Sequence, residues 1–528
     1  MRRLTRLELG PPSWLVRAIA PKPAAFPWPE SVQAVLAITG PLAFGLLTGQ
    51  LPSASFLAIG GLTAATTNTH GPLPWRLRRS SSALVAAAVG LAVGLATGAQ
   101  PLLAIAAMLV LALVAALISV IGAIASLAAL ELLVYAAVGS SLAGRVPLLL
   151  SSGEMLLGGI WGLCLTVVVG LVVGYRRPER EAVARVFQRI AELLAATGAP
   201  WREQARRALT DALNDAFDEL LGVRSRTGGR AWPVLRLTAL LNSSAPLVEA
   251  TVGIAYSGRR PHPALHDAAA GLAEAIRGDQ AAPHADLGET DSPLLSAWRR
   301  AYQGVLQSWH RAVLPATPPT PGERLGTIAD QILAGRGTWR FVIRLVLCMT
   351  IAEVLEQVLP IARSYWIAMT VAIVLKPDFG SVFVRGLQRG LGTIAGVILG
   401  FGMLLVLPDR PLLFAGIAVL GGLLPYAILR NYGMFATFLT PLVLLLLELI
   451  TSGGHQADVT VAVARLIDTV IGCGVALLAG YALWPESWRS QLPSRVAAAA
   501  RVLGDYLAAA FRPDRPAARL LRRRTYRT

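Results

Sequence analysis

Charged residues are scarce in this chain, and lysine is almost missing. Asp, Glu, Lys and Arg make up only 15% of the 528 residues, against about 25% in a typical soluble protein. The only lysines are Lys22 and Lys376, and the other 46 of the 48 basic residues are arginine. Neither lysine follows a glycine, so the chain lacks the Gly-Lys-Ser/Thr of a phosphate-binding Walker A loop. That absence excludes a self-contained ATP-driven pump.

Cysteine and histidine are also rare, and neither is spaced for a metal. Cys164, Cys348 and Cys473 all lie in apolar stretches, where cysteine behaves as a small hydrophobic residue, so no disulfide framework or zinc site is expected. His262 and His266 are four residues apart, but a proline lies between them and no carboxylate cage accompanies them. With no nucleophile, metal or cofactor constellation in view, we expect no cofactor and no catalytic residues, and an enzyme is the least favoured class.

Hydrophobic residues, by contrast, make up 54% of the chain and fall into long runs. A helix that crosses the bilayer core needs roughly 17–25 apolar residues. The sequence therefore predicts an all-α, polytopic membrane protein with two halves of six helices each. The predicted spans lie near residues 31–49, 51–67, 81–99, 101–119, 121–139, 156–175, 340–359, 362–375, 388–407, 411–428, 433–450 and 462–483. The second and eighth are short, which predicts that they are tilted, broken or packed inside the bundle.

The arginines explain the net charge of +17 without a nucleic-acid partner. They cluster beside alternate ends of the spans, as the positive-inside rule requires of cytoplasmic loops. The clusters are Arg76, Arg78 and Arg79; Arg176, Arg177 and Arg180; Arg336, Arg340 and Arg344; Lys376, Arg385 and Arg389; Arg430; and Arg489 with Arg522, Arg523 and Arg524. The opposite loops hold only Arg145, Arg363 and Arg410. We expect a cell-membrane protein whose termini and central segment are cytoplasmic, with the lipid bilayer as its partner.

The two halves repeat each other at an offset of 310 residues. Arg79 aligns with Arg389, and Pro101 aligns with Pro411; Ala58 and Gly90 likewise align with Ala368 and Gly400. Because each half has six spans, both halves share one orientation, which predicts a parallel repeat about an axis along the membrane normal.

Between the halves, charges return at helical spacing with apolar residues among them. This pattern predicts a small helical domain, joined to the second half by a Pro/Thr-rich linker at 315–322. The expected division is a basic cytoplasmic arm at 1–30, a first membrane half at 31–175, a cytoplasmic helical domain at 176–337, a second membrane half at 338–485 and a basic cytoplasmic tail at 486–528.

Unusual residues are densest in the second half of the chain, where the second predicted span of that half ends and the chain turns into the third. An apolar segment that starts at Tyr365 and Trp366 ends in Lys376, turns at a proline and a glycine around Asp378, and restarts behind two arginines. These arginines are Arg385 and Arg389. We take all six residues as candidates for substrate binding or gating. A snorkelling anchor is the alternative for Lys376, and an interfacial aromatic belt is the alternative for the two rings.

These residues resemble the signature of the fusaric-acid-resistance (FUSC), or aromatic acid exporter, family. The matching positions are Tyr365-Trp366, Thr370, Lys376-Pro377-Asp378-Phe379-Gly380, Arg385, Arg389-Gly390, Gly392-Thr393, Gly396, Asn431-Tyr432, Phe435-Ala436-Thr437, Arg465, Asp468-Thr469, Gly472 and Trp484-Pro485. The resemblance implies two six-helix halves around a cytoplasmic domain, and export of small organic, often aromatic, acids driven by the proton gradient. The first half departs from the motif: Thr66-Thr67-Asn68 stands where the second has Lys376-Pro377-Asp378. If the motif binds substrate, only one half supplies the charges.

Four ionisable residues inside the predicted spans are candidates for carrying a coupling proton, since such residues are costly in a membrane and usually functional. Asp468 lies one helical turn from Arg465, and Glu353 lies one turn from Glu356. Two carboxylates that close favour binding a proton. The alternatives are an internal ion pair for Arg465 and Asp468, and a solvated place at the outer interface for the two glutamates.

The sequence thus predicts a secondary transporter for small organic anions. An anion channel of the malate-channel type and a non-transporting membrane scaffold are the alternatives. A homo-oligomer and an accessory efflux protein are both compatible with this interpretation.

Overall fold

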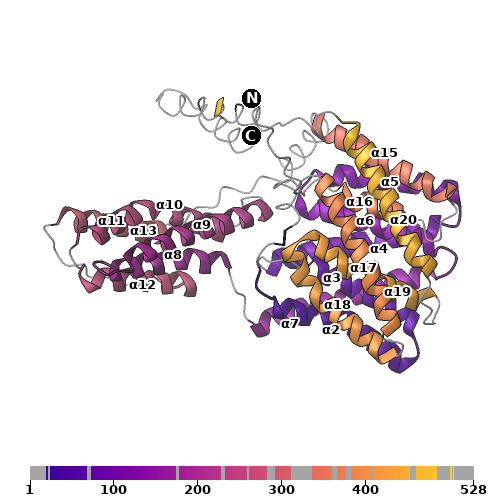
Figure 1. Cartoon of the computed structure of the whole chain (residues 1–528), viewed down its shortest axis with the longest axis horizontal. Helices are drawn as coiled ribbons and strands as arrows, with labels where there is room; N and C mark the ends of the chain where they lie inside the picture. Colours follow the sequence, from indigo (N-terminus) through magenta and orange to yellow (C-terminus); the bar gives the residue numbers. More distant parts are fainter. Residues whose placement is uncertain are drawn as a thin grey trace, which may run out of the picture.

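The computed structural model (Figure 1) is helical throughout the residues that it describes, which include no strand. The predicted all-α architecture is thereby confirmed. The described residues are 20–21, 24–67, 73–173, 178–227, 232–258, 261–281, 292–310, 336–359, 365–375, 382–406, 410–451 and 459–484, with the single positions 497, 500, 501 and 504.

Each of the twelve predicted spans has a helix. The first half consists of α2 (Trp28–Thr48), α3 (Leu51–Thr67), α4 (Leu73–Thr97), α5 (Pro101–Ser119), α6 (Ala123–Leu142) and α7 (Leu148–Val173). The second consists of α15 (Arg336–Val358), α16 (Trp366–Val374), α17 (Val382–Val406), α18 (Arg410–Arg430), α19 (Tyr432–Thr451) and α20 (Val459–Leu477), which a π-helical turn (Leu478–Ala482) continues. Within the described residues, eight helices are long and apolar enough to cross a membrane.

The second helix of each half lies inside the bundle, as its short apolar run predicts. In α16, eight of the nine residues are buried, and α3 has 17 residues that are mostly buried. A nine-residue helix is about 14 Å long, well short of a bilayer core of about 30 Å. The outward surface of the longer helices is apolar instead: Leu47, Leu102 and Leu149 are each more than 80% exposed. Lipid tails are the surroundings that such a surface suits.

The packing repeats between the halves. In the first half α3 packs on α7 and α4 on α6; in the second, α16 packs on α20 and α17 on α19. The contacts between halves are reciprocal, because α2 meets α18 while α5 meets α15, and α3 meets α19 while α6 meets α16. This exchange of partners is the pattern of an approximate two-fold relation between two parallel repeats.

Glycine permits the closest of these helix contacts. A Cβ atom added to Gly94 of α4 would lie 2.2 Å from the carbonyl oxygen of Ala136 in α6. In the second half, a Cβ added to Gly392 of α17 would lie 2.5 Å from the carbonyl oxygen of Gly433 in α19. Membrane helices that approach so closely need small residues at the contact. The contact between α4 and α6 and the corresponding contact between α17 and α19 therefore both depend on glycine.

The central block forms a helical domain with its own core, beside the membrane helices (Figure 1). Its helices are α8 (Pro178–Ala195), α9 (Arg202–Thr227), α10 (Trp232–Ser243), α11 (Ala245–Tyr256), α12 (Pro263–Gly278) and α13 (Pro293–His310). Phe187, Trp298 and Tyr302 are among its fully buried side chains. The predicted helical character of this block is confirmed.

The start of α8 and the end of α13, where the chain connects to the two membrane halves, meet at one corner of the domain. Arg180, near the start of α8, forms a 2.6 Å ion pair with Asp279, and Arg236 of α10 contacts the same carboxylate at 3.3 Å. The Arg236 guanidinium also lies 3.7 Å from the ring centroid of Trp309 and donates to the Trp309 carbonyl oxygen. The indole N–H of Trp309 donates to the carbonyl oxygen of Gln280. We call Arg180, Arg236, Asp279 and Trp309 the corner cluster.

Replacing Asp279 by asparagine tests how much the corner cluster stabilises the domain. Asp279 adopts a left-handed backbone with φ 54°, which asparagine tolerates, so the substitution removes only the charge. We expect a loss of about 1–2 kcal/mol, because Arg180 is left buried without its counter-ion. Backbone amides of α8 and α12 should exchange hydrogen roughly tenfold faster in the full chain. The matched control is Asp267→Asn, whose side chain is 76% exposed; equal exchange in both variants would contradict the expectation.

Candidate functional site

The two arginines of α17 have different surroundings. Arg385 is buried and its Nη1 donates to the carbonyl oxygens of Ile373 and Val374 at 3.4 and 3.3 Å. These carbonyls end α16, where the helix dipole is negative and backbone acceptors lack partners within the helix. Arg389, one turn further along α17, is only 2% exposed, and its Nε has no hydrogen-bond partner among the described residues. Arg385 therefore caps α16, whereas Arg389 keeps a donor unused.

Arg465 of α20 is stacked on the tryptophan that begins α16. Its guanidinium carbon lies 4.2 Å from the ring centroid of Trp366, close enough for a cation–π contact. Both side chains are buried, at 2% and 0% exposure. Within the described part of the chain, neither Nε nor Nη1 of Arg465 has a hydrogen-bond partner, and the indole N–H of Trp366 also lacks one. The aromatic ring thus covers one face of the guanidinium and leaves N–H groups at its rim available.

Carboxyl groups from α15 and α20 lie close to one another, and one of them, Asp468, lies close to Arg465. Asp468 is fully buried and Glu353 is 1% exposed. No described residue hydrogen-bonds to either oxygen of Asp468 or to Oε2 of Glu353. Glu356 interacts electrostatically with both of them, and Arg465 interacts with Asp468 and Arg389. The predicted turn spacing of Arg465 and Asp468 is present, but hydrogen bonds do not join the two side chains.

Hydroxyl groups complete the site, and these are the residues that we did not single out from the sequence. Thr370 of α16, Thr393 of α17 and Tyr432 of α19 each have a buried hydroxyl oxygen with no partner in the described segments. All three stand inside the family signature quoted above, which was the available signal. A polar atom left unpaired in a low-dielectric interior costs several kcal/mol. So many unpaired atoms in one place indicate a site that water or a bound ligand completes.

Glycine again explains how the site is assembled. A Cβ added to Gly472 of α20 would lie 2.7 Å from Cβ of Thr370 and 2.9 Å from the carbonyl oxygen of Ile367. This close contact holds α20 against α16, so that Arg465 stays over Trp366. Tyr365 lies beside that tryptophan, with ring centroids 5.4 Å apart. Of the ten predicted candidates, Lys376 and Asp378 lie outside the described residues, and the other eight fall on α15, on α16 and its N-cap, on α17 and on α20.

Polar side chains of the first half form hydrogen-bonded pairs between helices. Gln33 donates to the hydroxyl of Thr166 at 2.6 Å, and Thr63 shares a 2.6 Å hydrogen bond with Tyr135. Arg79, the counterpart of Arg389, lies 5.3 Å from the ring centroid of Trp75. In this half the hydroxyls of Ser31, Ser126 and Ser152 lack hydrogen-bond partners among the described residues, whereas in the second half the atoms without partners include those of charged side chains such as Arg465 and Asp468.

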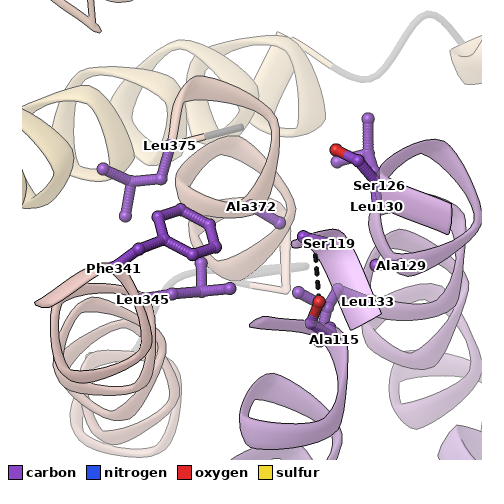
Figure 2. Close-up of a pocket in the computed structure, with 10 residues that line it drawn as sticks. All are labelled: Ala115, Ser119, Ser126, Ala129, Leu130, Leu133, Phe341, Leu345, Ala372 and Leu375. Carbon is purple, nitrogen blue, oxygen red and sulfur yellow. Dashed lines mark hydrogen bonds between the residues drawn. The ribbon is translucent and has the colours of Figure 1, made fainter. Parts of the chain in front are cut away.

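A small cavity elsewhere in the bundle is a different site. Figure 2 shows it between α5, α6, α15 and α16, lined by Ala115, Ser119, Ser126, Ala129, Leu130, Leu133, Phe341, Leu345, Ala372 and Leu375. It has room for about one water molecule and carries no charge. It is too small for an organic acid. Across the described residues, no three His, Cys, Asp or Glu side chains are grouped to hold a metal ion.

The fold and the site together define a multi-pass membrane protein of the transporter type. The sequence profile of the fusaric acid resistance protein-like family matches residues 347–479, a segment that contains Glu353, Trp366, Arg389 and Arg465. This match confirms the resemblance to the family that the motif around Tyr365 and Arg389 predicted.

Curated relatives extend the similarity across the chain. It is 25% identical over 521 residues to the uncharacterized membrane protein YvaC of Bacillus subtilis, covering 91% of this chain and 76% of YvaC. It is 33% identical over 151 residues to the uncharacterized protein YhfK of Escherichia coli, covering 28% of this chain but only 21% of YhfK. It is 30% identical over 137 residues to aluminum-activated malate transporter 14 of Arabidopsis thaliana, covering 23% and 24% of the two chains. No solved structure matches.

Replacing Arg465 by methionine distinguishes a ligand-binding arginine from one that holds the bundle together. We expect the free energy of unfolding to change by less than about 1 kcal/mol. The lost cation–π contact, about 2 kcal/mol when desolvated, is offset because a buried and incompletely paired cation is removed. Thermal unfolding in detergent micelles measures this. A loss of about 3–5 kcal/mol would instead identify Arg465 as half of a structural ion pair.

Proposed function

We propose that the protein is a secondary transporter that exports small organic acids, aromatic ones in particular, across the cytoplasmic membrane in a proton-dependent way. The observation that carries the proposal is the buried pair Arg389 and Arg465, whose free N–H groups lie beside carboxylates that also lack partners. Buried charges in membrane helices are expensive and are found where substrates, ions or protons pass.

A carboxylate is the ligand that this arrangement fits. Arginine presents planar N–H donors that match a carboxylate, and two arginines side by side repel each other until an anion binds between them. The indole ring under Arg465 and the adjacent Tyr365 offer aromatic surface to a planar substrate. The hydroxyls of Thr370, Thr393 and Tyr432 add neutral hydrogen-bonding groups.

Asp468, Glu353 and Glu356 are the groups that would carry the coupling proton. Their ionisation changes the electrostatic field at the arginines, so proton binding and anion binding at the site are linked. Occupancy of the site by the anion then depends on proton binding. The loop arginines favour a protein with both termini and the central domain in the cytoplasm, and export is the direction that the resemblance to the fusaric acid resistance family implies.

Flux of a labelled hydroxybenzoate into proteoliposomes, with and without an imposed pH gradient, tests the proposal. We expect flux that depends on the gradient and that falls at least tenfold in Arg389→Met and Arg465→Met. The matched control is Arg79→Met, at the corresponding position of the first half, which should retain most of the flux. Equal losses in all three variants would mean that the charged site of the second half has no special role.

The carboxylates make a separate prediction. In Asp468→Asn and Glu353→Gln, flux driven by a substrate gradient should persist while its dependence on the pH gradient weakens or disappears. Measuring the initial rate at several imposed gradients separates these effects. If both variants kept the native dependence, the coupling scheme would fail, although anion transport itself would not.

An anion channel is the second candidate, because one relative is named as a malate transporter. The same buried arginines would then lower the barrier for an anion that passes without a coupled proton. Planar-bilayer recording decides between the two: sustained current that is independent of the pH gradient favours the channel, and its absence favours the transporter.

A further inference from the structure

The two halves meet along two seams that the approximate two-fold relation makes equivalent. In one, α5 and α6 face α15 and α16; in the other, α18 and α19 face α2 and α3. We call these the α5–α15 seam and the α2–α18 seam. Because the same helices of each repeat meet in both, any difference between the seams comes from their side chains.

The α2–α18 seam is filled. A Cβ atom added to Gly421 would lie 2.9 Å from Cδ1 of Ile38, and one added to Gly422 would lie 3.0 Å from Cγ2 of Val35. Two adjacent glycines of α18 thus receive branched side chains of α2, and Ile38 is completely buried. At the end of this seam the rings of Phe26 and Tyr426 are in contact, with centroids 5.3 Å apart.

The α5–α15 seam is incompletely filled. The cavity of Figure 2 lies in it, with Ala115 and Ser126 on the first half and Leu345 and Ala372 on the second. Ser126 is 1% exposed, and its hydroxyl has no hydrogen-bond partner in the described part of the chain. The hydroxyl of Ser119 donates back to the carbonyl oxygen of Ala115, within its own helix. Neither serine therefore joins the two halves.

A void of this kind weakens a contact, because the atoms around it lack partners for dispersion attraction. In the α2–α18 seam the branched side chains of Val35 and Ile38 fit against Gly422 and Gly421, so equal strain on both seams would separate the α5–α15 seam first. Transporters built from two repeats change access by rocking one repeat against the other. We infer that the two halves part at the α5–α15 seam during the transport cycle, while the α2–α18 seam acts as the hinge.

Helix α16 connects this seam to the charged site. Ala372 and Leu375, at and just beyond its end, line the cavity, while Trp366 at its beginning supports Arg465. Arg385 fixes the end of α16 to α17 through the carbonyls of Ile373 and Val374. In so short a helix, a shift at the seam is transmitted to Trp366. Opening of the seam therefore alters how Arg465 is presented to the anion.

Cross-linking tests the inference, which extends the proposed transport cycle. In a background where Cys164, Cys348 and Cys473 are replaced by alanine, the pair Ala115→Cys and Leu345→Cys would be bridged across the cavity with a cleavable dithiol linker. We expect hydroxybenzoate flux to fall at least tenfold and to recover on cleavage. The matched control is Val35→Cys with Gly422→Cys across the α2–α18 seam, which should retain flux within about twofold. Equal inhibition by both bridges, or none by the first, would overturn the inference.

Thiol modification provides a readout that does not require transport. Ser126→Cys, in proteoliposomes under an imposed pH gradient, should react with a small methanethiosulfonate at a measurable rate, while Ile38→Cys in the filled seam should stay protected. Reaction of Ser126→Cys in a protein that moves no acid would support the seam and count against the proposed function. Protection of both positions would overturn the seam, whatever the flux.

A cavity-filling variant covers the case in which the cysteine pairs fail to fold. Ala115→Val places two methyl groups at the wall of the void, so we expect a higher melting temperature together with severalfold slower flux. A higher melting temperature with native flux would show that the seam stays closed during the cycle.

Discussion

A buried guanidinium group supported on one face by an indole ring is the interaction on which the second half depends. Arg465 can remain at this depth because Trp366 lies 4.2 Å beneath it and because Gly472 lets α20 approach α16. Arg389 brings a second positive charge close to Arg465, and the carboxyl group of Asp468 lies close to Arg465 as well. Within the described residues no hydrogen bond joins Arg465 to Asp468. The bundle therefore keeps charged groups buried with atoms that lack hydrogen-bond partners, at a cost in stability that neutral residues would avoid.

Duplication has given the two halves the same helices and different chemistry. The first half joins its helices through polar pairs such as Gln33 with Thr166. In the second half, buried arginine and carboxylate side chains keep atoms without hydrogen-bond partners among the described residues, although the helix contacts are the same. The buried cations and carboxylates that we propose as the transport site therefore all lie in the second half. The unequal seams are a second result of the same divergence.

Much of the architecture could be predicted from the sequence, since apolar length and arginine placement depend on the membrane and not on tertiary detail. The predicted spans coincide with the helices to within several residues, the largest shifts being at the starts of α4 and α7, which begin at Leu73 and Leu148 where the predicted spans begin near residues 81 and 156. The difference at α4 arises because Arg76, Arg78 and Arg79 interrupt hydropathy without interrupting the helix. Charged site residues such as Arg389 and Asp468 were also identifiable, because charges stand out in an apolar run. The hydroxyls of Thr370 and Thr393 were not, since threonine is common in membrane helices and only burial without a partner distinguishes them. The capping role of Arg385 depends on where α16 ends in space, which no local pattern specifies.

The corner cluster has a consequence for how such a chain can be built. Arg180 pairs with Asp279, and Trp309 contacts the neighbouring residue Gln280. The chain therefore enters the domain from one membrane half and leaves it toward the other at the same corner. An insertion of this kind is self-contained, since its two ends close on each other and its core does not depend on the halves that flank it. A duplicated six-helix unit could acquire the domain between its copies in one step, without rearranging either copy. The central domain could therefore be exchanged among relatives without changing the helix contacts between the two membrane halves.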